Sequence, residues 1–232
     1  MSITTVFFDV GNTLLTPAIA ESEVIVQAAA SLGAQVDPAL VEQSMPLMYA
    51  RYEELYEADD SFWADEGRAS GIWVDLYEYL CGLLGIPELG PEVARIGYER
   101  FLDPDSWTLF DDVIPTLFAL KSRRVSIGLI SNWDHSLTSI IEGMGIRFYF
   151  DVVLASADVG LHKPQPEIFR LALHETEAFA SETIHVGDHL QADVGGATAA
   201  GINPVLIDRD DRHPDGEGYI RITNLRDLIK HL

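Results

Sequence analysis

The sequence predicts an α/β fold in which helices cover both faces of a mostly parallel β-sheet, with a helical domain inserted after the first strand. Two observations support this prediction. Short apolar runs rich in β-branched residues alternate with stretches of helical pattern along most of the 232 residues. One long segment near the N-terminus breaks the alternation, because it contains several helical patterns and no convincing strand.

The first strand is expected at residues 3–8, which are β-branched or aromatic and end at Asp9. Gly11 and Asn12 follow, and both favour a turn. Similar runs predict the later strands, and the stretches between them predict the crossover helices that parallel strands require. The strands are expected at 125–130, 152–154, 183–186 and 204–207, and the helices at 136–144, 166–174, 192–200 and 225–232.

The inserted domain is expected to cover residues 18–103. Apolar residues in this segment recur at spacings of three and four, as on one face of a helix, at Ile72, Leu76, Leu80 and Leu83. Proline and glycine residues divide the segment into several helices. The expected organisation is a core formed by residues 1–17 and 104–232, with a helical cap formed by residues 18–103.

Composition excludes several classes of partner. The net charge is −22, from 15 basic and 37 acidic residues, so the surface repels nucleic acid and anionic lipid. No run of about 18 apolar residues suggests a membrane span, and no basic residue precedes the first apolar stretch as in a signal peptide. Cys81 is the single cysteine, which fits a reducing compartment. We expect a cytoplasmic protein that is a monomer or a homodimer.

Polar residues follow the expected strands. Asp9 ends the first strand, Ser131 and Asn132 end the second, and Asp188 ends the fourth, while Lys163 lies in a loop before a helix. Ligands of open parallel sheets bind beyond the carboxyl ends of the strands. A nucleophile, a hydroxyl, a cation and a further acid should therefore meet at one edge of the sheet.

Four motifs resemble those of the haloacid dehalogenase-like (HAD) hydrolase superfamily. They occur in the family's order along nearly the whole chain, as FFDVGNTL at 7–14, LISN at 129–132, GLHKP at 160–164 and VGDHLQAD at 186–193. The helical insert resembles the cap that one subfamily places after the first strand. The resemblance implies a Rossmann-like three-layer core.

The resemblance also implies a mechanism that starts at Asp9. This carboxylate would attack phosphorus and form an aspartyl phosphate, dividing one difficult displacement into two easier ones. Mg²⁺ would be the cofactor, since it accepts oxygen ligands and compensates the charge of both anions. Its ligands would be the Asp9 carboxylate, the Gly11 carbonyl and the Asp188 carboxylate. Asp193 would bind directly, through a water molecule, or as support for the other ligands.

Three further residues are implied to hold the phosphoryl group. Ser131 would donate from its hydroxyl and Asn132 from its amide and its main-chain N–H. Lys163 would provide a point charge that also orients Asp9. The structural alternative for Ser131 and Asn132 is that they cap the following helix.

Gly11 departs from the pattern of typical phosphatases in the superfamily, which carry a second aspartate at this position to protonate the leaving alcohol. The leading interpretation is a Mg²⁺-dependent phosphatase that acts on a small phosphorylated metabolite. One alternative is a non-catalytic protein that binds phosphate or a metabolite. Another is a 2-haloacid dehalogenase, since these enzymes also lack this acid, although they need no Mg²⁺.

Other residues near the motifs have a functional and a structural interpretation. His162 and His189 flank motif residues, and each is a candidate substitute for the missing acid. Asp134 is expected to cap a helix. The aromatic residues of the cap are expected to pack in its core rather than to line a pocket, at Tyr52, Tyr56, Trp63 and Trp73.

Overall fold

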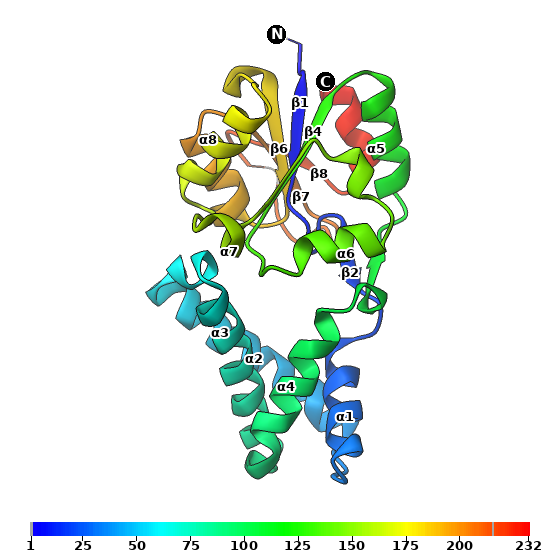
Figure 1. Ribbon diagram of the computed structural model, residues 1–232, viewed down its shortest axis with the longest axis vertical. Coiled ribbons are helices and arrows are strands. Elements are labelled where there is room, and N and C mark those ends of the chain that lie inside the picture. The colour runs from blue at the N-terminus through cyan, green and yellow to red at the C-terminus, as the bar shows by residue number, and fades with distance from the viewer. Residues whose placement is uncertain (1, 215) are drawn as a thin grey trace.

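The computed structural model describes residues 2–214 and 216–232, so residue 1 of the expected core segment 1–17 lies outside the described part. Its main sheet has six parallel strands in the order β5-β4-β1-β6-β7-β8 (Figure 1). The predicted α/β class with a parallel sheet is confirmed. The strands of this sheet are β1 (Thr5–Phe8), β4 (Ser126–Ser131), β5 (Val152–Ala155), β6 (Thr183–Gly187), β7 (Asn203–Ile207) and β8 (Ile220–Ile222).

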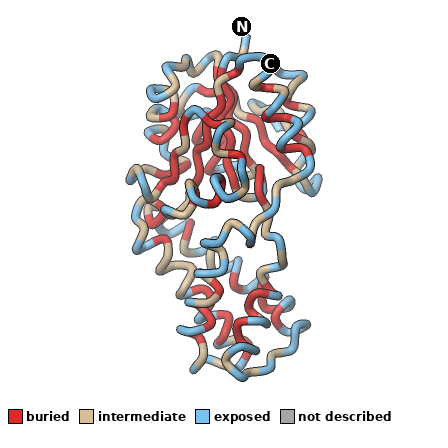
Figure 2. The backbone as a smooth tube through the Cα atoms, turned by 45° about the vertical axis from the view of Figure 1, so that its right-hand side comes forward, coloured by how far each residue is buried: buried red, intermediate tan, exposed pale blue. Residues whose placement is uncertain are grey.

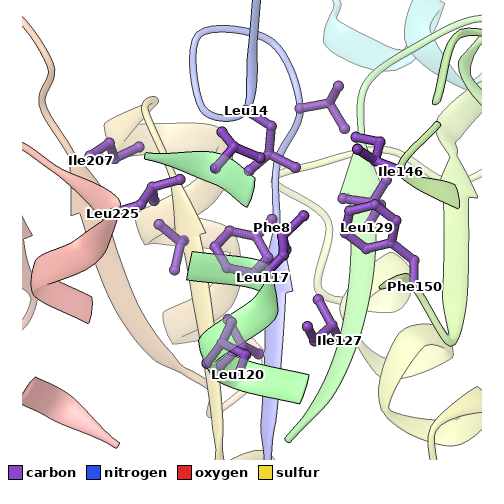
Figure 3. Close-up of a cluster of buried hydrophobic side chains, with 14 of the residues drawn as sticks. Phe8, Leu14, Leu117, Leu120, Ile127, Leu129, Ile146, Phe150, Ile207 and Leu225 are labelled. Atoms are coloured by element: carbon purple, nitrogen blue, oxygen red, sulfur yellow. The ribbon is translucent and has the colours of Figure 1, made fainter. Parts of the chain in front are cut away.

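The central strand β1 separates two layers of helices, because successive side chains of a strand point to opposite faces. Phe8 packs with Leu117 and Leu120 on one face (Figure 3). Phe7 packs with Phe169 on the other face. The core helices are α5 (Val113–Ser122), α6 (Leu137–Gly143), α7 (Ser156–Val159), α8 (Pro166–Glu175) and α9 (Gly196–Ala199), with 3₁₀ turns at Pro104–Ser106, Arg147–Tyr149, Ala180–Glu182 and Leu225–His231.

The helical insert predicted after the first strand is present. It consists of α1 (Glu21–Ser31), α2 (Pro38–Ala58), α3 (Glu66–Leu83) and α4 (Gly90–Phe101), with 3₁₀ turns at Asp60–Ala64 and Pro87–Leu89. Ile72, Leu76 and Leu80 pack into an apolar centre of its own. The burial colours of Figure 2 show this second core below the sheet core, separated from it by less buried chain.

Several features of the fold were not predicted, among them the core helices α5 and α7. Two short strands, β2 (Leu15–Pro17) and β3 (Trp107–Leu109), pair antiparallel where the chain enters and leaves the insert (Figure 1). These strands and β8 have three residues each, which is too short for an alternating pattern to show. The helix expected at 192–200 begins earlier, as a π-helical turn at Leu190–Gly195. Among the described residues, each helix is either too short or too polar to span a bilayer.

Candidate active site

Asp9 follows β1 at the carboxyl edge of the sheet, and its side chain is almost fully buried. Ser131 Oγ donates a hydrogen bond of 2.9 Å to Asp9 Oδ1, and Lys163 Nζ donates to the same oxygen at 2.6 Å. Asp9 Oδ2 lies 3.4 Å from the hydroxyl of Thr13. Within the described residues, Oδ2 has only this long contact, so it is the oxygen better placed to bond to an electrophile or a cation.

Lys163 joins Asp9 to a second carboxylate. Its Nζ also donates to Asp193 Oδ1 at 2.6 Å. Burial opposes the charged form of Lys163, but the attraction of Asp193 and Asp9 outweighs burial and raises the Lys163 pKa. Burial likewise opposes ionised Asp193, whose pKa is nevertheless lowered by Lys163 and by a bond from His185. Lys163 and Asp193 therefore form an ionised pair in the interior.

Asn132 is turned toward the main chain of Lys163. Its Oδ1 accepts a hydrogen bond from Lys163 N at 2.8 Å, and its Nδ2 donates to Lys163 O at 2.9 Å. This differs from the expected use of the amide as a phosphoryl donor. The amide matches the N–H and C=O of one residue, so the side chain fixes the loop that carries Lys163. A contact between the Asn132 main-chain N–H and a phosphoryl group stays a prediction.

Three carboxylates gather at this edge of the sheet. Ligand oxygens of Asp9, Asp188 and Asp193 all lie within 4.8 Å of one another. Burial and the charges of Asp9 and Asp193 raise the pKa of Asp188 to about 8. Three carboxylates and one ammonium group leave two negative charges uncompensated when all are ionised. Oxygen donors with this excess charge match what Mg²⁺ requires, and Gly11 lines the same cavity.

Asp193 is held by more donors than Asp188. Its Oδ1 accepts from Lys163 Nζ and, at 2.8 Å, bonds to His185 Nε2; its Oδ2 accepts from His189 N at 3.1 Å. Of the three roles that the sequence left open for Asp193, this engagement favours support of the neighbouring groups. The π-helical turn brings the side chain inward, and such turns are frequent at functional sites.

His185 is a contributor that the sequence reasoning missed. It lies in the middle of β6, fully enclosed, with its ring edge against Phe169 at a centroid distance of 4.9 Å. Since Asp193 is ionised, His185 Nε2 is the atom that carries the proton. Burial lowers the His185 pKa, so the ring is neutral. A histidine inside a buried apolar strand requires a polar partner, and this signal was readable from the sequence.

The loop after Asp9 is anchored by Arg209, which lies outside the four motifs. Asn12 adopts a left-handed conformation with φ of 51°, which asparagine tolerates. Arg209 donates to Asn12 O from Nε at 3.1 Å and also bonds to Thr13 O. Its guanidinium contacts both oxygens of buried Asp112 at 3.1 Å. Arg209 thus fixes the loop that continues from the expected nucleophile.

A cavity of about 620 Å³ opens between the sheet edge and the cap, a size typical of sites for small ligands. The core contributes Asp9, Ser131, Asn132, Lys163 and Asp188 to its lining. The cap contributes mainly aromatic side chains, at Tyr49, Tyr52, Tyr56, Trp63, Trp73, Tyr77, Tyr98 and Phe101. The cap aromatics that were expected only to pack in the core therefore also form the wall of the cavity.

The two histidines beside the motifs have different surroundings. His162 is buried, bonds to Lys163 O through Nδ1 at 3.1 Å and does not line the cavity. His189 lines the cavity, and its Nδ1 accepts from Ala192 N at 3.0 Å, so that nitrogen caps the π-helical turn. Asp134 was predicted to cap a helix, but the N-cap of α6 is Ser136, and no side chain in the described residues caps that helix. Asp134 instead accepts from Ser136 N at 2.8 Å in the turn before the helix, and from Tyr98 OH of the cap at 2.8 Å.

Comparison with known proteins identifies the family. A model of the haloacid dehalogenase-like hydrolase family matches residues 3–201, well over half of the chain. The chain belongs to this family. This HAD-like hydrolase is 32% identical over 213 residues to haloacid dehalogenase-like hydrolase domain-containing protein 3 of Danio rerio, covering 89% of the chain and 85% of that protein.

Two further similarities concern a named phosphatase and a solved structure. The hydrolase is 32% identical over 148 residues to a phosphoserine phosphatase of Thermus thermophilus, covering 62% of the chain and 58% of that protein. Its fold matches the magnesium-bound HAD-hydrolase YfnB of Bacillus subtilis with a TM-score of 0.83 and 20% identity, covering 100% and 99% of the two chains. The predicted Rossmann-like core with a helical cap is thus confirmed.

Proposed function

We propose that this hydrolase is a Mg²⁺-dependent phosphatase that acts on a small phosphorylated metabolite through an aspartyl-phosphate intermediate on Asp9. The observation that carries the proposal is the contact between Lys163 Nζ and both Asp9 and Asp193, beside an acidic cluster that has two excess negative charges when Asp188 is ionised. One ammonium group orients the nucleophile and provides positive charge, and the cluster offers oxygen ligands to a divalent cation. The relatives named as phosphatases, and the magnesium in YfnB, agree with it.

The protein groups would act in sequence. Asp9 Oδ2 would attack phosphorus, forming an O–P bond while the ester P–O bond breaks and the electron pair leaves with the alcohol. Lys163 has three N–H donors, of which Asp9 and Asp193 engage two. The third, with the Asn132 main-chain N–H and with the Ser131 hydroxyl after it turns from Asp9 Oδ1, would stabilise charge on the phosphoryl oxygens. Water would then hydrolyse the aspartyl phosphate and restore Asp9.

Asp9, Asp188 and the carbonyl of Gly11 would hold Mg²⁺, which supplies electrostatic stabilisation of the phosphoryl oxygens. Gly11 offers no side chain to protonate the leaving alcohol. Esters of acidic alcohols, such as phenols, need that proton least, so these should be the best substrates.

Dehalogenation is the principal rival reaction, since a 2-haloacid dehalogenase of Pseudomonas syringae shares the fold. The acidic cluster disfavours it: a haloacid is an anion, and without a divalent cation it would be repelled by the excess negative charge of the cluster, which is one charge at neutral pH and two once Asp188 ionises.

The decisive experiment measures phosphate release from 4-nitrophenyl phosphate and from a panel of phosphorylated metabolites, with Mg²⁺ and with EDTA. We expect release that requires Mg²⁺ and disappears in Asp9→Asn. Fluoroberyllate, a mimic of the phosphoryl group, should raise the thermal midpoint of the wild type with Mg²⁺ but not that of Asp9→Asn. Metal-independent chloride release from 2-chloropropionate would instead identify a dehalogenase. Binding of Mg²⁺ or phosphate without turnover would identify the binding protein.

A further inference from the structure

The cap wall of the cavity combines aromatic rings with carboxylates. Among the cavity-lining residues, the side chains with positive charge, Lys163 and Arg212, belong to the core, whereas the cap contributes Glu21 and Glu53. Over residues 18–103 the sequence has 17 acidic residues, four arginines and no lysine or histidine. The part of the cavity lined by the cap, away from the proposed phosphoryl site, therefore disfavours a ligand group with negative charge.

Glu21 is the most informative of these groups. It is the first residue of α1, at the end of that helix nearer the core (Figure 1). Its Oε1 accepts from Tyr77 OH at 2.6 Å and its Oε2 accepts from Tyr49 OH. Burial raises the Glu21 pKa against the effect of these two bonds. In the described residues no lysine, arginine or histidine forms an ion pair with Glu21, so its charge lacks a cation.

A row of rings connects this carboxylate to the phosphoryl end. Tyr56 stacks on Tyr52 with centroids 6.0 Å apart, Tyr52 stacks on Trp73 at 5.6 Å, and Trp73 contacts Tyr77 at 6.3 Å. At one end the Tyr56 ring lies 5.8 Å from that of His189, the neighbour of Asp188. At the other end Tyr77 bonds to Glu21. All four rings line the cavity, and such faces attract apolar groups and cations.

An independent observation indicates that the row contacts a ligand. Tyr56 is 6% exposed, and its hydroxyl has no hydrogen-bond partner in the described residues. A buried hydroxyl without a hydrogen-bond partner lowers the stability of the folded protein. Tyr56 lines the cavity close to the acidic site, so a polar atom of the substrate would satisfy it.

We propose that the substrate is a phosphomonoester with an apolar or aromatic body and a terminal ammonium group, which pairs with Glu21 between Tyr49 and Tyr77. The phosphoryl group would lie at Lys163 and Ser131, the body along the aromatic row, and the ammonium group at the cap. The assignment rests on the proposed phosphatase function. It makes Glu21 the residue that determines charge selectivity.

Three phosphate esters of similar phenols test the proposal, because they differ mainly in terminal charge. They are the phosphates of 4-(2-aminoethyl)phenol, of its N-acetyl derivative and of 4-(2-carboxyethyl)phenol. We expect kcat/KM for the ammonium ester to exceed that for the neutral ester by about 10- to 100-fold, as for a charge-assisted hydrogen bond. Glu21→Gln should bring the ratio close to one through KM. Glu23→Gln removes the same charge from an exposed site on α1 and should leave the ratio unchanged.

The outcomes separate this inference from the function on which it rests. Equal kcat/KM values for the three esters, or a preference that survives in Glu21→Gln, would overturn the inference and leave the phosphatase function intact. If no ester releases phosphate, the phosphatase function fails, and calorimetry with 4-(2-aminoethyl)phenol then decides the inference. Binding that weakens at least tenfold in Glu21→Gln but not in Glu23→Gln supports the ammonium site. No binding to the wild type excludes it.

Discussion

Lys163 Nζ lies 2.6 Å from Asp193 Oδ1, and the two side chains are only 3% and 2% exposed. A buried ion pair of this kind adds little net stability over an apolar pair, but removing one partner leaves a buried charge without compensation. The contact therefore ties the stability of the core to the same groups that would perform the reaction.

Replacement of Lys163 by glutamine should strongly destabilise the folded protein. At pH 7 the free energy of unfolding should fall by about 3–5 kcal/mol, because Asp9 and Asp193 lose their buried counter-charge. Denaturant titration without Mg²⁺ measures the change. Lys121→Gln is the matched control: its pair with Asp151 is partly exposed, so its loss should stay within about 1 kcal/mol. Equal losses in the two variants would contradict this account.

The raised pKa of Asp188 should make the stability of the metal-free protein depend on pH. Its pKa rises from 3.8 to about 8 on folding, so the folded state retains a proton that the unfolded chain releases. The resulting stabilisation is complete below about pH 4 and is lost as the pH rises through about 8. Asp188→Asn, which stays neutral, should show a smaller fall in thermal midpoint between pH 5.5 and 8.5 in EDTA. A change of 1 kcal/mol corresponds to roughly 2–4 °C for a chain of this size.

Mg²⁺ should reverse this loss in the wild type alone. At pH 8.5 the ion should raise the thermal midpoint of the wild type and leave that of Asp188→Asn nearly unchanged, because the variant lacks one ligand. Identical pH profiles for the two proteins in EDTA would show that Asp188 does not hold the proton.

Gly11→Asp should introduce the missing acid. A Cβ at Gly11 meets the Trp133 ring at 3.5 Å, an ordinary van der Waals contact. A carboxyl group here should protonate the leaving alcohol and raise kcat for alkyl phosphates by about 10²–10⁴, the usual value of acid–base catalysis. Aryl phosphates should gain much less. Gly11→Asn, with the same shape and no titratable proton, is the control, and an equal gain from it would exclude a proton-transfer role.

Arg209→Lys should lower turnover although it preserves the charge. Lysine cannot contact Asp112, Asn12 and Thr13 together as the guanidinium does. We expect kcat to fall by about 10–100-fold as the loop beyond Asp9 shifts, with a smaller change in KM. Arg226→Lys, whose guanidinium bonds to Asp111 O at the surface, should retain normal kcat. Steady-state kinetics with 4-nitrophenyl phosphate compares the two.

The sequence was sufficient to predict the parallel sheet, the helical insert and the convergence of Asp9, Ser131, Lys163 and Asp188. Strand ends and apolar periodicity are local patterns, and a parallel sheet brings its strand ends together. Contacts made by side chains distant in sequence were not readable. Asn132 turns to the Lys163 main chain, and Arg209 reaches back to the loop after Asp9, only because folding places them there. The cap aromatics had a helical pattern that does not show which face meets the cavity.

The antiparallel pair of β2 and β3 has an evolutionary consequence. The chain leaves the core through one of these strands and returns through the other, so α1 to α4 form one continuous segment of the chain (Figure 1). The reacting groups come from outside that stretch. Recombination at the two neighbouring crossings could exchange the whole recognition surface while inheriting Asp9 and Lys163 unaltered, which would let one chemistry diversify across many metabolites.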